Sequence, residues 1–146
     1  MRTLSVFSVA ALTVAMSTVA LAHVSIGPKQ WQAHATQTYT IRVPAEGTVP
    51  TTMLQLEVPP GIEVVSVAAP AGISYELKKE STRVVRIVWS MSLQPGSVAE
   101  LSFVAQNPGP GQVFWKSHQH FADGTVNHYD EPAGSRRPAV PTTLVP

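Results

Sequence analysis

His23 directly follows Ala20-Leu21-Ala22, a small-x-small sequence typical of the sites that signal peptidases cut. A cut after Ala22 gives His23 a free α-amine beside its imidazole. The amine nitrogen and the near ring nitrogen can then close a six-membered chelate around one metal ion. An internal histidine cannot do this, because its nitrogen belongs to an amide. Such nitrogen donors suit Cu(II), the ion at the top of the divalent affinity order, so the sequence predicts a copper site that proteolysis creates.

The first 22 residues have the features of a cleavable export signal. Met1-Arg2 is a short basic start, and Leu4 to Leu21 is apolar with interspersed Ser and Thr. An uncleaved membrane anchor is the alternative, since the stretch is about long enough to cross a bilayer. The cut site favours cleavage, and no second apolar run of that length follows. We therefore expect a signal peptide at 1–22 and a bacterial protein that is periplasmic or secreted, with no stable membrane span after cleavage.

The composition excludes several classes of site and partner. The chain has no cysteine, so disulfides, thiolate zinc sites and cysteine nucleophiles are excluded. The formal net charge is only +1, which gives no electrostatic footprint for nucleic acid or an anionic membrane surface. Soft ligands for Cu(I) are scarce, because only Met53 and Met91 remain after the cut. The oxidised ion, Cu(II), is therefore the expected cofactor.

Beyond His23 the pattern is strand after strand, with no segment of helical character. Apolar and polar side chains alternate, as in half-buried strands, at residues 38–43, 54–58, 73–78 and 99–103. Turns rich in Pro and Gly separate these segments at short intervals, which is typical of an antiparallel β-sandwich. We expect one domain over residues 23–140. Beyond Asp130 the composition predicts a proline-rich strap or loose tail, with a C-terminal tail at 141–146.

A second group of candidate ligands lies at His118, His120 and His128. Histidines two apart on a strand can chelate a metal, although solvent-facing polar residues are the more common explanation. His34, in a polar segment after Trp31, is interpreted as a surface residue.

The register of one hairpin decides which of these residues meet. Asp123-Gly124 is a strong signal for a two-residue turn, which pairs positions whose numbers sum to 247. Gln119 and His128 then lie on one face of the hairpin. The other face carries His118, His120 and Tyr129, with His118 opposite Tyr129. A slip of one residue reverses the faces.

Four short motifs follow one another along the chain. They are Ala22-His23-Val24-Ser25-Ile26-x-Pro28, Arg42-Val43-Pro44-Ala45-Glu46, Leu54-x-Leu-x-Val-Pro-x-Gly and Phe121-Ala122-Asp123-Gly124-Thr125-Val126. In this order they resemble the YcnI-like copper-binding domain family (DUF1775), whose mature chains begin with histidine after an Ala-x-Ala cut. The resemblance covers His23 to about Val140.

The resemblance implies a cupredoxin-like β-sandwich that binds Cu(II) through a mono-histidine brace. His23 would supply amine and imidazole, and Glu46 a carboxylate. Tyr129 stands where the family has a tryptophan near the metal, which keeps an aromatic wall and adds a hydroxyl. If Tyr129 approaches the copper, His118 becomes a candidate additional ligand. The asparagine of the family signature is replaced by Ala45.

Three functions are compatible with these residues. The first is an exported protein that stores, buffers or delivers Cu(II), with another copper-handling envelope protein as its candidate partner. The second is a histidine-brace copper monooxygenase, in which His118 or His120 would have to supply a second imidazole. The third is a metal-independent module that binds another envelope protein. No hydrolase triad, phosphate-binding glycine loop or paired-carboxylate motif is legible, so we expect copper binding without enzymatic activity.

Overall fold

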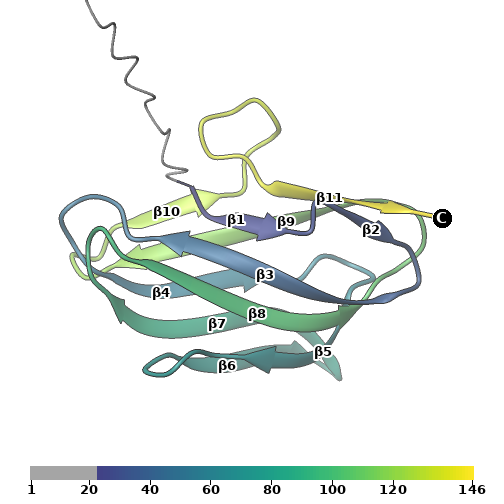
Figure 1. Cartoon of the computed structure of the whole chain (residues 1–146), viewed down its shortest axis with the longest axis horizontal. Coiled ribbons are helices and arrows are strands. Elements are labelled where there is room, and N and C mark those ends of the chain that lie inside the picture. Colours follow the sequence, from purple (N-terminus) through teal and green to yellow (C-terminus); the bar gives the residue numbers. More distant parts are fainter. Residues whose placement is uncertain (1–22) are drawn as a thin grey trace, which may run out of the picture.

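Alternating apolar residues build two β-sheets that pack face to face in the computed structural model, which describes residues 23–146 (Figure 1). The first sheet has the strand order β1-β3-β8-β5, and the second has the order β2-β11-β9-β4-β7-β6, with β10 paired to β9. The strands are β1 (Ser25–Gly27), β2 (Gln30–Gln32), β3 (Thr36–Pro44), β4 (Thr51–Glu57), β5 (Glu63–Ala68), β6 (Ser74–Glu80), β7 (Arg83–Leu93), β8 (Val98–Gln106), β9 (Gly111–Phe121), β10 (Val126–Tyr129) and β11 (Val140–Val145). The prediction of an all-β sandwich is confirmed. The expected signal peptide lies outside the described residues.

The core lies between the inner faces of the two sheets. On β3 the side chains of Tyr39, Ile41 and Val43 are buried, while Thr38 and Thr40 are exposed, as the alternation predicted. Tyr39 stacks on Phe103 of β8 with ring centroids 5.3 Å apart, and it meets Trp115 of β9 at 4.9 Å. These aromatic contacts join the two sheets, because Trp115 belongs to the second sheet.

The inner face of β9 changes from apolar to polar along the strand. Val113 and Trp115 belong to the hydrophobic core, whereas Ser117 and Gln119 continue the same buried face with polar side chains. Buried polar groups require hydrogen-bond partners, so this end of the sandwich is held by specific bonds as well as by packing. The candidate ligands lie at this end.

The C-terminal segment is not the loose tail that its prolines predicted. Residues 140–145 form β11, which pairs antiparallel with β9 and parallel with β2. Thr142 and Leu144 are buried, and the Oγ1 of Thr142 accepts a hydrogen bond of 3.0 Å from Trp115 Nε1. The prediction of a tail at 141–146 is therefore wrong for all but the last residue. The polar β2 was also missed, since it is exposed and exists through its pairing with β11.

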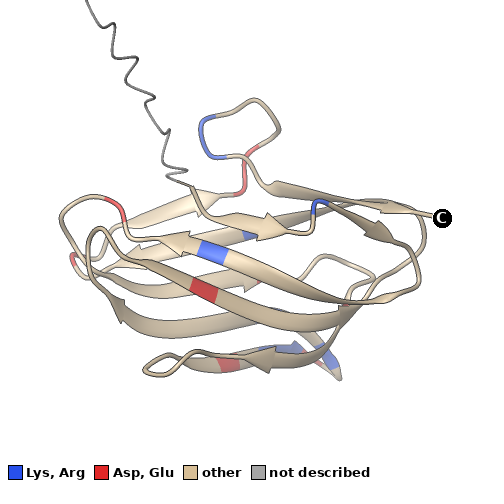
Figure 2. Ribbon diagram, viewed as in Figure 1, with Lys and Arg blue, Asp and Glu red and all other residues tan. Residues whose placement is uncertain are grey.

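Charged residues of both signs are interspersed over the described ribbon (Figure 2). The loop at 130–139 carries two arginines on the side that returns toward β11 and acidic residues where it leaves β10 (Figure 2). Residues 23–146 contain no apolar helix of membrane-spanning length.

Candidate metal centre

His23 stands at the entrance to β1, exposed to solvent, with its ring against Tyr129 of β10. The ring centroids are 5.6 Å apart and the interplanar angle is 62°, an edge-to-face arrangement. The next residue, Val24, is buried and forms a backbone hydrogen bond with the Tyr129 phenol. The first residue after the predicted cut is therefore placed beside a buried aromatic wall.

Glu46 follows the end of β3 and is held there by bonds to its neighbours. The N–H of Ala45 donates to Ser97 O at 2.9 Å, and the N–H of Gly96 donates to Ala45 O at 2.9 Å. Gly47 has a φ of +75°, which turns the chain directly after Glu46 at little steric cost for glycine. The half-buried carboxylate thus sits on a fixed loop.

Gln119 supports this loop from the core. Its Nε2 donates to the carbonyl of Pro44 and to the Oγ1 of Thr51, both at 2.9 Å, and its Oε1 lies 3.5 Å from the Tyr129 hydroxyl. The side chain is fully buried. The side-chain amide of Gln119 therefore links the Pro44 carbonyl, two residues before Glu46, to Tyr129, whose ring contacts His23. Gln119 was placed on one face of the hairpin from the sequence, but its bonds to the loop were not predicted. A glutamine among the buried positions of a strand could have indicated that it has buried hydrogen-bond partners.

The pKa of Tyr129 depends on the charge of Glu46. Burial raises the pKa of the Tyr129 phenol, and the negative charge of Glu46 raises this pKa further. Hydrogen bonds from Asn127 and the Val24 backbone and the positive charge of Arg137 act in the opposite direction. Glu46 is therefore close enough to Tyr129 to change the energy of its ionisation.

The structure relates His23 and Glu46 through Tyr129. His23 lines a depression formed with β1 and residues 138–143, whereas Glu46 lines a second depression with Thr125 and Asn127. The ring of Tyr129 contacts the first residue, and its phenol is influenced by the second. Two nitrogen donors and one carboxylate oxygen are the kinds of ligand that Cu(II) accepts in a tetragonal set.

The register predicted for the hairpin is wrong by one residue. His118 pairs with His128, and Tyr129 pairs with Ser117, so that the paired numbers sum to 246. The cause is the length of the loop. Phe121 N donates to Thr125 O at 3.0 Å, and this hydrogen bond closes a loop of three residues, the last of which, Gly124, has a φ of +86°. Three-residue loops with a left-handed last residue are a common alternative to the two-residue turn.

The corrected register separates His118 from Tyr129. The side chain of Tyr129 points into the core with Ser117 and Gln119, while His118 and His120 belong to the outer face of β9. The predicted face shared by His118, His120 and Tyr129 does not exist. His118 was a candidate copper ligand only if it shared a face with Tyr129. It lies on the opposite face and is therefore not brought near Tyr129.

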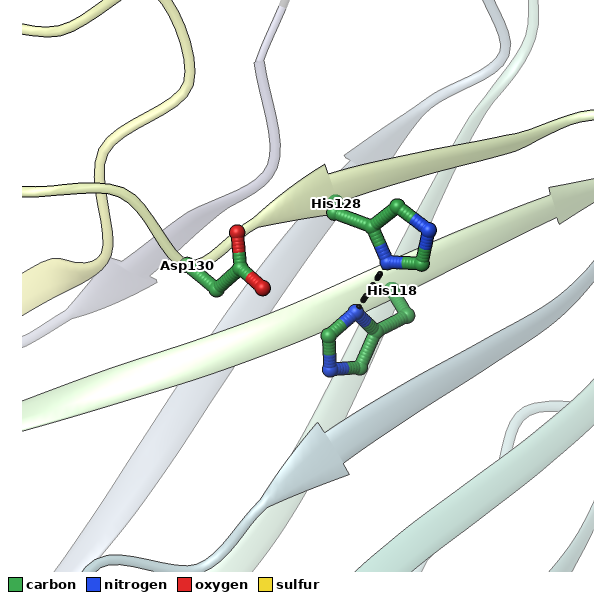
Figure 3. A group of neighbouring side chains, drawn as sticks. All are labelled: His118, His128 and Asp130. Atoms are coloured by element: carbon green, nitrogen blue, oxygen red, sulfur yellow. Dashed lines mark hydrogen bonds between the residues drawn. The ribbon is translucent and has the colours of Figure 1, made fainter.

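The outer face carries its own histidine cluster, in which His118 and His128 meet Asp130 (Figure 3). His120 lies nearby, and burial together with the charges of His118 and His128 lowers its pKa. His34 is exposed in a loop, as expected, with a φ of +58° and its N–H donating to Pro108 O at 3.0 Å.

Comparisons with known proteins agree on a family and a fold. A family model described as a domain of unknown function, DUF1775, matches residues 23–145. The copper-binding protein CutI of Bacillus subtilis (strain 168) is 31% identical over 111 residues, which are 73% of this chain and 54% of CutI. The chain thus spans about half the length of this curated relative.

Two solved structures show the same sandwich. A crystal structure of an uncharacterized protein from Nocardia farcinica, with an immunoglobulin-like fold, has a TM-score of 0.76 at 20% identity and covers 85% of this chain and 99% of that chain. A cohesin–dockerin complex from Clostridium thermocellum has a TM-score of 0.51 at 12% identity, with 84% and 98% covered. The fold is therefore immunoglobulin-like. The family model covers nearly all of the described residues, and the chain belongs to the DUF1775 family.

Proposed function

We propose that this chain is an exported copper-binding protein that holds Cu(II) at His23 and Glu46 after a cut between Ala22 and His23. The observation that carries the proposal is the position of His23. It is the first residue that the structure describes, and it lies edge-on against Tyr129, whose phenol has its pKa raised by the charge of Glu46. After the cut, His23 would supply a terminal amine and an imidazole, and Glu46 a carboxylate.

The relative named copper-binding protein CutI supports copper as the ion. The donor set supports the oxidised form, since it contains nitrogen and oxygen and no thiolate. The mono-histidine brace, the cupredoxin-like character of the β-sandwich and the periplasmic or secreted location are parts of the same proposal. Its role would be to store, buffer or deliver copper, with another copper-handling envelope protein as the partner.

Binding without turnover is the version that the geometry favours. A histidine-brace monooxygenase needs a second imidazole at the copper, and the two candidates on β9 face away from the side of the sheet that holds Tyr129. Tyr129 occupies the inward position instead, packed against His23. The proposed site therefore has one imidazole.

The test is a Cu(II) titration of residues 23–146 beside the same chain acetylated at the α-amine of His23. Acetylation turns the amine into an amide, adds no new amine and leaves every side chain in place. We expect one tightly bound Cu(II) with a mixed nitrogen and oxygen electron paramagnetic resonance spectrum in the first protein. Acetylation should weaken this binding by more than the roughly 10–100-fold that loss of an outer-shell partner costs. Equal affinities in two forms with the same thermal stability would exclude the brace.

A further inference from the structure

The outer face of the hairpin brings two imidazoles into direct contact. His118 of β9 and His128 of β10 are cross-strand partners, and their Nδ1 atoms lie 2.7 Å apart (Figure 3). The rings meet nearly edge to face, with centroids 4.9 Å apart. At this distance one Nδ1 donates its proton to the lone pair of the other, so loss of that single proton leaves two ring nitrogens available to an ion.

Glu57 of β4 fixes the orientation of His118 from behind. Its Oε2 lies 3.1 Å from His118 Nε2, and Arg86 NH2 lies 3.9 Å from the other carboxylate oxygen of Glu57. A carboxylate that accepts the Nε2–H of a histidine leaves Nδ1 free as a donor to a metal. Histidines that bind metals are commonly held by a carboxylate in this way. His118 is therefore oriented for binding through Nδ1, and its side chain is only 14% exposed.

Asp130 adds an oxygen donor on the same side. It lies two residues beyond His128, and Figure 3 shows its carboxylate turned toward the histidine pair. One ligand atom from each of His118, His128 and Asp130 lies within 4.8 Å of the other two. Metal–nitrogen bonds of about 2.0–2.1 Å hold two ring nitrogens roughly 3 Å apart. The two Nδ1 atoms now point at each other, so binding an ion requires both imidazoles to turn toward a common position as well as to separate slightly.

We propose that His118, His128 and Asp130 form a second metal site, which takes a divalent ion of the Zn(II) or Cu(II) class. Two imidazoles and one carboxylate are a common set of three protein ligands for such ions, with water in the remaining position. The site is separate from the one at His23, because Tyr129 lies between His128 and Asp130 in sequence and points to the opposite face of β10. One strand thus contributes to two metal sites, one on each face.

The test uses Zn(II) and residues 23–146 acetylated at the α-amine of His23, so that the terminal chelate is blocked in every sample. Zn(II) binding is measured by calorimetry and by the proton resonances of the histidine rings. We expect one saturable Zn(II), with the ring signals of His118 and His128 shifting together.

The variants target the exposed ligands, because His118 is largely buried. His128→Asn and Asp130→Asn should each weaken Zn(II) binding, the first by at least about tenfold, or 1.4 kcal/mol. His34→Asn is the matched control, since it removes an exposed histidine at a left-handed position that asparagine tolerates. It should bind Zn(II) as the parent does.

Two results would overturn this second site. One is the absence of saturable Zn(II) binding to the blocked protein, and the other is equal affinity in His128→Asn and His34→Asn. Neither result bears on the copper site at His23, whose readout is the difference between the free and the blocked amine.

Discussion

The ring of His23 meets the ring of Tyr129 edge to face, with centroids 5.6 Å apart. Tyr129 is fully buried, so the exposed histidine rests on a surface that belongs to the core. Tyr129, which stands where the family has a tryptophan, therefore contacts the ring of His23, the residue that we propose as a copper ligand. The contact limits the directions in which the imidazole of His23 can present its nitrogens. Substitution of Tyr129 can therefore test whether this contact affects metal binding.

Replacing Tyr129 separates the contribution of its ring from that of its hydroxyl. Tyr129→Phe keeps the ring against His23 and loses only weak or shared hydrogen bonds, so unfolding free energy should fall by about 1 kcal/mol. Tyr129→Ala removes the wall, and loss of a buried aromatic side chain typically costs about 3–5 kcal/mol. Chemical denaturation and Cu(II) titration of both variants measure these effects. We expect Phe to retain copper affinity and Ala to reduce it, and loss of copper binding in Phe would identify the hydroxyl as a ligand.

Replacing Glu46 with glutamine tests the carboxylate ligand. The substitution keeps the shape of the side chain and removes its charge, so the Cu(II) spectrum should change and affinity should fall by roughly 10–100-fold or more. Glu63→Gln, at an exposed position on β5, is the control and should leave the spectrum unchanged. An unaltered spectrum in Glu46→Gln would place the oxygen ligand elsewhere.

Gln119 should act on copper through the loop that carries Glu46. Gln119→Ala leaves Pro44 O and Thr51 Oγ1 without their donor and opens space in the core. Each buried group without a partner costs about 1–3 kcal/mol, so we expect a clear loss of stability together with weaker copper binding. Gln112→Ala, on the exposed part of the same strand, is the control for both measurements. If Gln119→Ala loses stability but binds Cu(II) like the parent, Gln119 serves the core alone.

Tyr39 gives a prediction for alkaline pH. Burial raises the pKa of Tyr39 to about 12, and the hydrogen bond to Asn107 opposes this effect. Between the ordinary tyrosine pKa of about 10 and this value, the unfolded chain loses the proton while the folded chain keeps it. The contribution of this group to stability is therefore complete below about pH 10 and is lost as the pH rises toward about 12.

Denaturation at pH 8 and pH 11 measures this dependence. Tyr39→Phe should flatten it, at a cost of about 1–3 kcal/mol at neutral pH, since the Oδ1 of Asn107 loses a buried donor 2.6 Å away. Tyr75→Phe changes an exposed ring and should leave the dependence intact. An equal slope in Tyr39→Phe and the parent would show that other groups cause the alkaline loss.

Much of the sandwich was predictable because its central strands each bury one face. The alternation of Tyr39, Ile41 and Val43 with polar neighbours is the direct record of that burial. The strand β11 was hidden because its buried Thr142 and Leu144 alternate with Pro141 and Thr143, a composition that is also typical of loops. Its place depends on β9 and β2, which lie far from it in the sequence.

The candidate sites were predictable only in part. His23 and Glu46 could be identified as a pair from motifs, but the role of Gln119 depends on contacts that span 68 to 75 residues. His118 and His128 were named as candidate ligands but assigned to opposite faces, because one hydrogen bond, from Phe121 to Thr125, decides the loop length and hence which residues share a face. Local turn preferences do not distinguish two loops that differ by one residue.

The position of β11 also affects when the chain can fold. This strand lies inside the second sheet, between β2 and β9, although it is made from residues 140–145. A nascent chain that has not yet extended to these residues leaves the edges of β2 and β9 unpaired. Synthesis from the N-terminus therefore delays completion of the sheet until the segment emerges.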